Sequence, residues 1–208
     1  MRHTSWIVSA VLLTATAASA RDQDGHDGGD GYHEHDGFYL RLQVGGGYSR
    51  ASVVGEDLAI KGGAAGINAE VGAALTRNFI LYGKLFGTSV PSPDIEVGDV
   101  TIEGQDEDVS QNYGALGVGF TYYLMPANVY LSGALSFAQL TIDEDGEKIA
   151  ETDVGGGLHL GIGKEWWVSK NWGLGVGAEL ALGRVPEKDD SLKWNVVNGM
   201  VFLSATFN

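Results

Sequence analysis

The sequence has no cysteine, only 4 prolines, and 13 basic against 27 acidic side chains among its 208 residues. Without cysteine the chain forms no disulfide, and the N-terminus that remains after export carries no lipid-modified cysteine. The formal charge of −14 argues against nucleic acid and against anionic membrane surfaces as partners. After residue 20 there is no run of eighteen apolar residues, so we expect no transmembrane helix.

The first 20 residues have the features of an export signal. Arg2 precedes an apolar run over residues 6–13, and the small residues Ala18 and Ala20 stand just before Arg21. We therefore expect residues 1–20 to be a secretory signal peptide that is removed on export. An exported chain that lacks a spanning helix but alternates apolar and small residues has one way to cross a membrane, which is a closed β-barrel.

Residues 21–36 hold six acidic residues, three histidines and no aliphatic side chain. This composition predicts a flexible, solvated tail. His26, His33 and His35 are weak candidates for binding Zn²⁺, Ni²⁺ or Cu²⁺ through nitrogen and oxygen ligands. Flexible tails of this kind bind metals weakly whether or not they serve to, so a spacer is the favoured interpretation. We assign no cofactor to the chain.

The hairpin over residues 154–182 is the clearest structural signal. In its second arm every other residue from Trp172 to Leu182 is apolar, while most residues between them are glycine. A soluble sheet would place charged or hydroxyl side chains on its solvent face, whereas a transmembrane barrel exposes the apolar face to lipid and turns the small face inward. Trp166, Trp167 and Trp172, close to the turn, are then predicted to form part of an interfacial aromatic girdle.

The same alternation recurs along residues 37–208 and predicts eight strands. Three short turns, near residues 76–78, 125–128 and 168–171, alternate with four polar loops, and both ends of the domain lie on the short-turn side. The predicted loops cover residues 49–61, 89–110, 141–152 and 184–194. This sorting of short and long connections is typical of outer-membrane barrels. We therefore predict an all-β fold: an eight-stranded antiparallel up-and-down transmembrane β-barrel.

Residues 37–208 resemble the small outer-membrane barrel superfamily of Gram-negative bacteria, which includes the transmembrane domain of OmpA and OmpX. In that family the last strand ends in an aromatic residue that the barrel-insertion machinery reads. Phe207 matches it and follows Val201, Leu203 and Ala205 at intervals of two, although Asn208 comes after it. The resemblance implies a place in the outer membrane, with outer-membrane lipid, lipopolysaccharide and the insertion machinery as partners and the N-terminal tail in the periplasm.

Four charged residues are predicted to face the barrel interior. Counted from the short-turn side, Arg41, Glu70 and Lys84 fall at similar heights on adjacent strands, and Glu179 lies near that level. Paired with one another they fix the strand register, which is the favoured interpretation. The alternative, a network that rearranges to gate a narrow ion path, resembles the role attributed to the interior charges of OmpA. Inward aromatic side chains fill most of such a narrow barrel, although the many inward glycines leave room for small water-filled pockets.

The sequence offers little for catalysis. Outer-membrane lipid deacylases have a similar strand number but carry a His-x-Ser pair facing lipid, whereas here the spacing reads His159, Leu160, Gly161 and the histidine is predicted to face inward. We therefore expect a structural histidine and no enzyme activity. The favoured function is envelope integrity or surface interaction. A narrow gated channel and an adhesin acting through its surface loops remain alternatives.

Overall fold

The computed structural model describes residue 35 and residues 37–104, 108–188 and 191–208. These residues form eleven strands. The strands are β1 Phe38–Val53, β2 Leu58–Thr76, β3 Phe79–Pro91, β4 Asp94–Val97, β5 Val100–Ile102, β6 Val109–Leu124, β7 Val129–Glu144, β8 Glu147–Glu151, β9 Gly155–Trp167, β10 Trp172–Pro186 and β11 Lys193–Phe207. Over the same part of the chain, no helix has the length and apolar character needed to cross a membrane.

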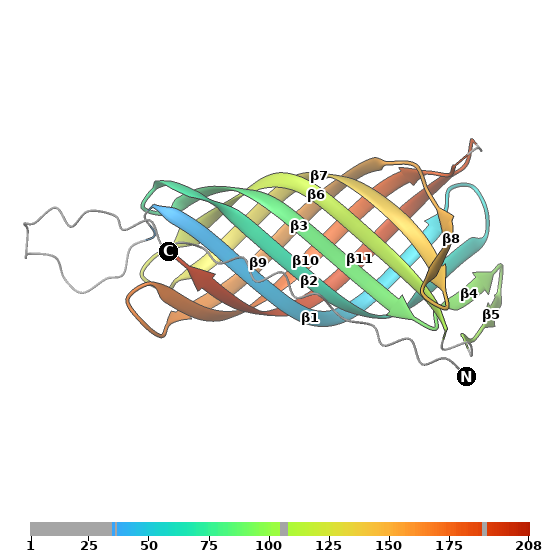
Figure 1. Cartoon of the computed structure of the whole chain (residues 1–208), viewed down its shortest axis with the longest axis horizontal. Helices are drawn as coiled ribbons and strands as arrows, with labels where there is room; N and C mark the ends of the chain where they lie inside the picture. The colour runs from blue at the N-terminus through green and yellow to red at the C-terminus, as the bar shows by residue number, and fades with distance from the viewer. Residues whose placement is uncertain (1–34, 36, 105–107, 189–190) are drawn as a thin grey trace, which may run out of the picture. The chain divides into compact units, whose positions relative to one another are not determined.

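The eight long strands close into a barrel (Figure 1). Each pairs antiparallel with the next in the order β1, β2, β3, β6, β7, β9, β10, β11, and β11 pairs back with β1. Closure pairs the backbone of every barrel strand on both sides, which is the condition for crossing hydrocarbon with strands. The predicted eight-stranded antiparallel up-and-down barrel is therefore confirmed.

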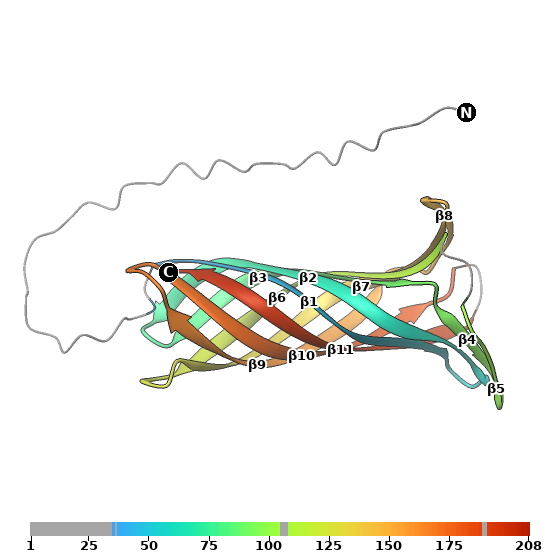
Figure 2. The same ribbon diagram turned by 90° about the horizontal axis from the view of Figure 1, so that it is seen from below.

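The two ends of the barrel differ in their connections. At the turn end the strands are joined by residues 77–78, 125–128 and 168–171. At the loop end they are joined by residues 54–57, 92–108, 145–154 and 187–192, and these contain β4, β5 and β8 (Figures 1 and 2). The C-terminus lies at the turn end.

The predicted long loops are in large part strand. β1 continues to Val53 and β2 begins at Leu58, so only four residues remain of the loop expected over 49–61. The segment expected as a loop over 89–110 contains the β4–β5 hairpin, and β8 pairs with β7. Beyond the apolar zone the outward side chains, such as Arg50 and Ser52, are polar while inward ones such as Ala51 stay buried. The row of outward apolar residues that marks a strand in the sequence therefore ends while the backbone pairing continues.

The barrel is inside out compared with a soluble protein. The outward side chains include large apolar residues such as Leu116 and Phe137, which are 64% and 74% exposed, while inward side chains such as Arg41 are fully buried. We call this outward zone the apolar belt. Exposed apolar residues over the midsection of the barrel form the belt: Leu42, Val44, Ile67, Val71, Leu81, Leu85, Leu116, Val118, Leu131, Leu135, Phe137, Leu160, Ile162, Leu174, Val176, Leu180, Val201 and Leu203. So much contiguous apolar surface suits lipid rather than water.

The inward glycines accommodate large rings instead of leaving pockets. A Cβ atom at Gly177 would lie 2.3 Å from the hydroxyl oxygen of Tyr130, and one at Gly163 would lie 2.5 Å from the same ring. Gly183 faces Tyr113 in the same way, at 2.7 Å. The expected water-filled space beside these glycines is therefore occupied by tyrosine. The inward tyrosines reach across the barrel because the strands facing them carry no side chain there.

Candidate functional site

Three of the predicted charged residues lie side by side on adjacent strands. Arg41 on β1 stands directly opposite Glu70 on β2, and Glu70 stands directly opposite Lys84 on β3. All three share the inward face and are at most 2% exposed. The hydrogen-bond register between these strands thus places a carboxylate between two cations.

The four residues predicted from the sequence do meet. Arg41 Nη1 lies 3.2 Å from Glu70 Oε2, and Lys84 Nζ lies 3.3 Å from Glu70 Oε1. Lys84 Nζ also reaches across the interior to Glu179 Oε2 on β10, at 3.0 Å. Each cation therefore has a carboxylate partner in a region from which water is excluded.

A fifth member, Glu165 on β9, was missed in the sequence. Arg41 Nε lies 3.0 Å from Glu165 Oε1, and Tyr123 Oη donates to Glu165 Oε2 at 2.9 Å. Arg41 Nη2 in turn donates to Tyr123 Oη at 2.7 Å, so the phenol links the ion pair. Glu165 stands six residues after His159, and this even spacing on one strand is the sequence signal that places it on the same inward face.

Five side chains are linked one to the next by these ion pairs, in the order Glu165, Arg41, Glu70, Lys84 and Glu179. We call this series of ion-paired residues the charge chain. Its charges alternate in sign from one member to the next. Burial of an ion is costly unless partners compensate for the lost water, and here each member has at least one partner of opposite charge. The arrangement joins side chains from four strands, β1, β2, β3 and β10, and a fifth, β9, through Glu165.

His159 extends the charge chain at Glu179. Its Nδ1 lies 2.9 Å from Glu179 Oε1 and its Nε2 lies 2.9 Å from Ser136 Oγ on the neighbouring strand β7. The position two residues after His159 holds no serine, but Ser136 on another strand contacts the ring instead. Ser136, His159 and Glu179 are thus hydrogen-bonded one to the next, as in a Ser-His-Glu triad. However, Glu179 is shared with Lys84, and the ring of Phe86 lies edge-on to His159 with centroids 5.0 Å apart. The serine hydroxyl therefore faces the packed interior and not the lipid surface.

Of the three tryptophans predicted for the aromatic girdle, two point outward and one points inward. Trp166 and Trp172 are 50% and 41% exposed on the outer face, and their place at a membrane interface stays a prediction. Trp167 points inward and its ring lies 5.2 Å from that of His35. Consecutive residues of a strand face opposite sides, so Trp166 and Trp167 cannot both contact lipid.

The C-terminal Phe207 completes an aromatic group at the turn end. Its ring lies 5.4 Å from Trp172 and 6.3 Å from Phe38. The backbone N–H of Asn208 donates to the carbonyl oxygen of Asn171, so the last residue is also held by the barrel. The role of Phe207 as an insertion signal stays a prediction.

His35 departs from the expectation of a flexible tail. It is fully buried, stacks on Tyr123 with ring centroids 3.5 Å apart, and hydrogen-bonds to Asn128 Oδ1 at 2.9 Å. The partners of His35 come from the barrel, so the composition of residues 21–36 does not predict its burial. Burial lowers the pKa of His35 below its ordinary value of 6.5, although the hydrogen bond to Asn128 opposes this shift.

The metal prediction rested on three histidines, and His26 and His33 lie outside the described residues. His35 binds the barrel through its ring. Among the residues that the structure describes, no group of three or more histidine, cysteine, aspartate or glutamate side chains is arranged to hold a metal ion.

The loop end carries exposed ion pairs of a different kind. Arg50 Nη2 on β1 lies 2.8 Å from Glu96 Oε1 on β4, and Lys61 on β2 also binds Glu96. Hydrogen bonds from these two cations lower the pKa of Glu96 to about 2. They attach the β4–β5 hairpin to the barrel wall.

No protein-family model matches the sequence, and no curated protein matches it either. Solved structures do match. The structure of neisserial surface protein A aligns at a TM-score of 0.53 and 18% identity, over 82% of this chain and 96% of that one. Ail, the attachment invasion locus protein of Yersinia pestis, aligns at 0.44 and 15%, over 83% and 99% of the two chains. The outer membrane protein AlkL aligns at 0.49 and 10%, over 90% and 96%.

The chain has the fold of a small outer-membrane barrel. The match to neisserial surface protein A shows this fold, and at 18% identity the likeness concerns the fold and not the activity. The resemblance predicted from the strands and turns is confirmed at that level.

Proposed function

We propose that the chain is a non-enzymatic barrel of the Gram-negative outer membrane that contributes to envelope integrity or surface interaction. Lipid and lipopolysaccharide surround the apolar belt, and the segment before β1 lies in the periplasm. The insertion machinery reads the last strand, which ends in Phe207. The observation that carries the proposal is a closed barrel whose outer face is apolar and whose interior is filled by side chains.

The interior contents favour a structural barrel over a pore. The turn-end half contains the charge chain and its tyrosines, and the loop-end half contains a second, apolar filling that includes Phe86, Tyr113, Met200 and Phe202. A solute would have to displace both. Eight strands enclose only enough room for such side chains.

The test is the state of the protein in the envelope. Membrane fractions are separated on a density gradient, and the protein is compared by gel mobility with and without boiling. We expect it in the outer-membrane fraction with a mobility that changes on boiling, because a closed barrel resists detergent at room temperature. Recovery in the soluble periplasm, with equal mobility in both samples, would rule the proposal out.

A second candidate, a narrow gated channel, is favoured by the alternating charges of the charge chain. Rearrangement of Lys84 between Glu70 and Glu179 would open a path along the interior, since Lys84 contacts both carboxylates. Planar-bilayer recordings of the wild type and of Lys84→Ala decide this question. Silence of both proteins excludes the channel.

A third candidate, an adhesin, is favoured by the β4–β5 hairpin. Its apolar residues Ile95, Val97, Val100 and Ile102 are 41% to 62% exposed at the loop end. Exposed apolar side chains on a structured hairpin suit contact with another macromolecule. Deletion of residues 93–104 should lower adhesion to host cells or matrix, whereas unchanged adhesion would exclude the hairpin.

A further inference from the structure

The outer wall of the barrel is hollowed where two glycines lie next to each other. Gly87 on β3 stands directly opposite Gly114 on β6, and both face outward. A Cβ atom at Gly114 would meet nothing within 4 Å, and one at Gly87 would meet only Ile67 Cγ1, at 3.6 Å, and the carbonyl oxygen of Tyr113, at 4.0 Å. Unlike the inward glycines, these two leave open space, which we call the notch.

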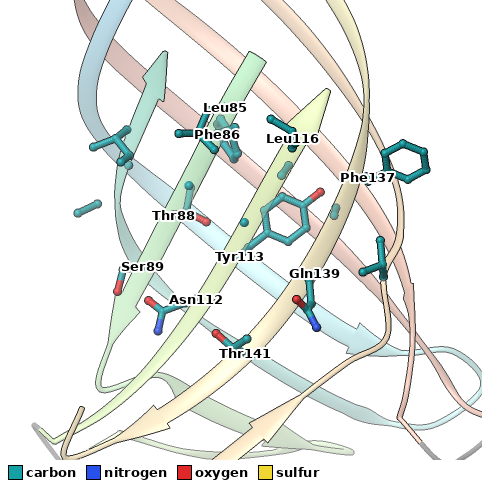
Figure 3. A pocket seen from close by; sticks show the side chains of 18 residues that line it. Leu85, Phe86, Thr88, Ser89, Asn112, Tyr113, Leu116, Phe137, Gln139 and Thr141 are labelled. Carbon is teal, nitrogen blue, oxygen red and sulfur yellow. The ribbon is translucent and has the colours of Figure 1, made fainter. Parts of the chain in front are cut away.

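The notch has an apolar side and a polar side. Leu85 and Leu116 form the pair of residues toward the turn end, and Ser89 and Asn112 form the pair toward the loop end. Phe137 on β7 stands opposite Leu116 and closes one flank. Figure 3 shows these side chains around a hollow of about 760 Å³.

The notch lies at the edge of the apolar belt. On β6, the outward residues from Leu124 to Leu116 are apolar, and after Gly114 the next outward residue is Asn112. On β3, Leu85 is followed outward by Gly87 and then by Ser89. The hollow thus spans the level at which hydrocarbon gives way to polar groups on the loop-end side.

The polar side of the notch is held in place and is uncharged. Asn112 Nδ2 donates to Asp143 Oδ2 at 2.8 Å and to Ser110 Oγ at 3.2 Å, which fixes its amide at the rim. None of the 18 residues that line the hollow is charged. A phosphate would find no cation here, whereas an ester carbonyl would find the Ser89 hydroxyl as a donor. An amide or hydroxyl group would also find Asn112 Oδ1 as an acceptor, because the Asn112 N–H groups are donated to Asp143 and Ser110.

We infer that the notch binds one acyl chain of an outer-leaflet lipid. The chain lies on Leu85 and Leu116, and its polar linkage lies beside Ser89 and Asn112. The continuity of the notch with the lipid-facing belt and its change from apolar to polar along the strands identify this occupant. The inference rests on the proposed place of the barrel in the outer membrane.

Native mass spectrometry of the full chain, refolded in detergent and titrated with dimyristoyl phosphatidylcholine, tests the inference. We expect the wild type to retain one lipid, and Gly114→Leu, which fills the notch, to retain it at least tenfold less. The matched control is Gly199→Leu on β11, an outward glycine where a Cβ atom also meets nothing within 4 Å. This variant should bind as the wild type does.

A second probe tests the polar linkage. The ether-linked analogue of the same lipid lacks the ester carbonyl groups, and we expect the wild type to retain it several-fold less. Equal retention by all three proteins, or no retained lipid in the wild type, would overturn the inference. Gel mobility of the same samples separates the two proposals. A change of mobility on boiling shows a folded barrel, so a loss of lipid binding in that sample counts against the notch alone. No change on boiling shows that no barrel formed, and this result counts against the proposed function.

Discussion

The interior of the barrel has two halves, of which one contains a network of buried charges and the other is filled by uncharged, mainly apolar side chains. Toward the turn end, five charged residues form a network of ion pairs, and the hydroxyl groups of Tyr39 and Tyr123 hydrogen-bond to it. Toward the loop end, the largest side chains form an apolar cluster built around Phe86, Tyr113, Met200 and Phe202. Uncharged polar pairs, Thr88 with Asn198 and Gln111 with Ser49, complete that half. Directional ion pairs specify which strands face one another, whereas apolar packing excludes water with little directional preference. We therefore expect the charged half to set the strand register and the apolar half to exclude water from the interior.

Removal of Arg41 should have the largest effect on the charged half. Arg41→Met leaves Glu70 with Lys84 alone and leaves Glu165 buried without a cation, and breaking a buried pair in this way costs about 3 to 5 kcal/mol. We expect that loss in the free energy of unfolding, measured by urea titration of tryptophan fluorescence in lipid vesicles.

The control for Arg41 is an arginine whose ion pair is exposed. Arg50 pairs with Glu96 but its side chain is 41% exposed, so Arg50→Met should change the unfolding free energy only slightly. If the two variants lose equal stability, burial does not distinguish the charged half from the loop-end surface.

Truncation of Phe86 should weaken the apolar half by a somewhat smaller amount. Phe86 is 1% exposed and contacts Phe202, Tyr113 and His159, so Phe86→Ala leaves a cavity that costs about 3 kcal/mol. The same urea titration measures this loss. Leu135→Ala, on the lipid face of β7, is the control, and a loss as large as that of Phe86→Ala would contradict the distinction between interior and belt.

The two halves were not equally visible in the sequence. Alternation along each strand identified which residues face inward, and counting from the turns aligned Arg41, Glu70 and Lys84, because these strands are immediate neighbours. Contacts across the interior, such as Arg41 with Glu165, depend on the tilt and stagger of the closed barrel, which no local pattern encodes. His35 was missed for a similar reason, since its partners Tyr123 and Asn128 come from a different part of the chain.

A glycine substitution should have a smaller effect, and it tests how the tyrosines fit the charged half. Gly177→Val places side-chain atoms where the Tyr130 hydroxyl now lies, and overpacking of this kind costs about 1 to 3 kcal/mol. Gly199→Val, at an open outward position, should cause no such loss. Equal unfolding free energies for both variants would show that the inward glycines are not needed for ring packing.

The smallest predicted effect concerns the turn-end boundary of the charged half, where His35 caps it. His35 faces Tyr123 on β6, the carboxylate of Glu165 on β9 and the guanidinium of Arg41 on β1, and burial is the main cause of its lowered pKa. A released His35 would regain the ordinary value of 6.5, so the released form takes up a proton first as the pH falls. Docking of the ring should therefore be fully favoured above pH 6.5 and weaken progressively as the pH falls below it. NMR titration of the imidazole, assigned with His35→Gln, should give a pKa below 6.5. A value at or above 6.5 would mean that the charge of Glu165 outweighs burial, and that acid strengthens the cap instead of releasing it.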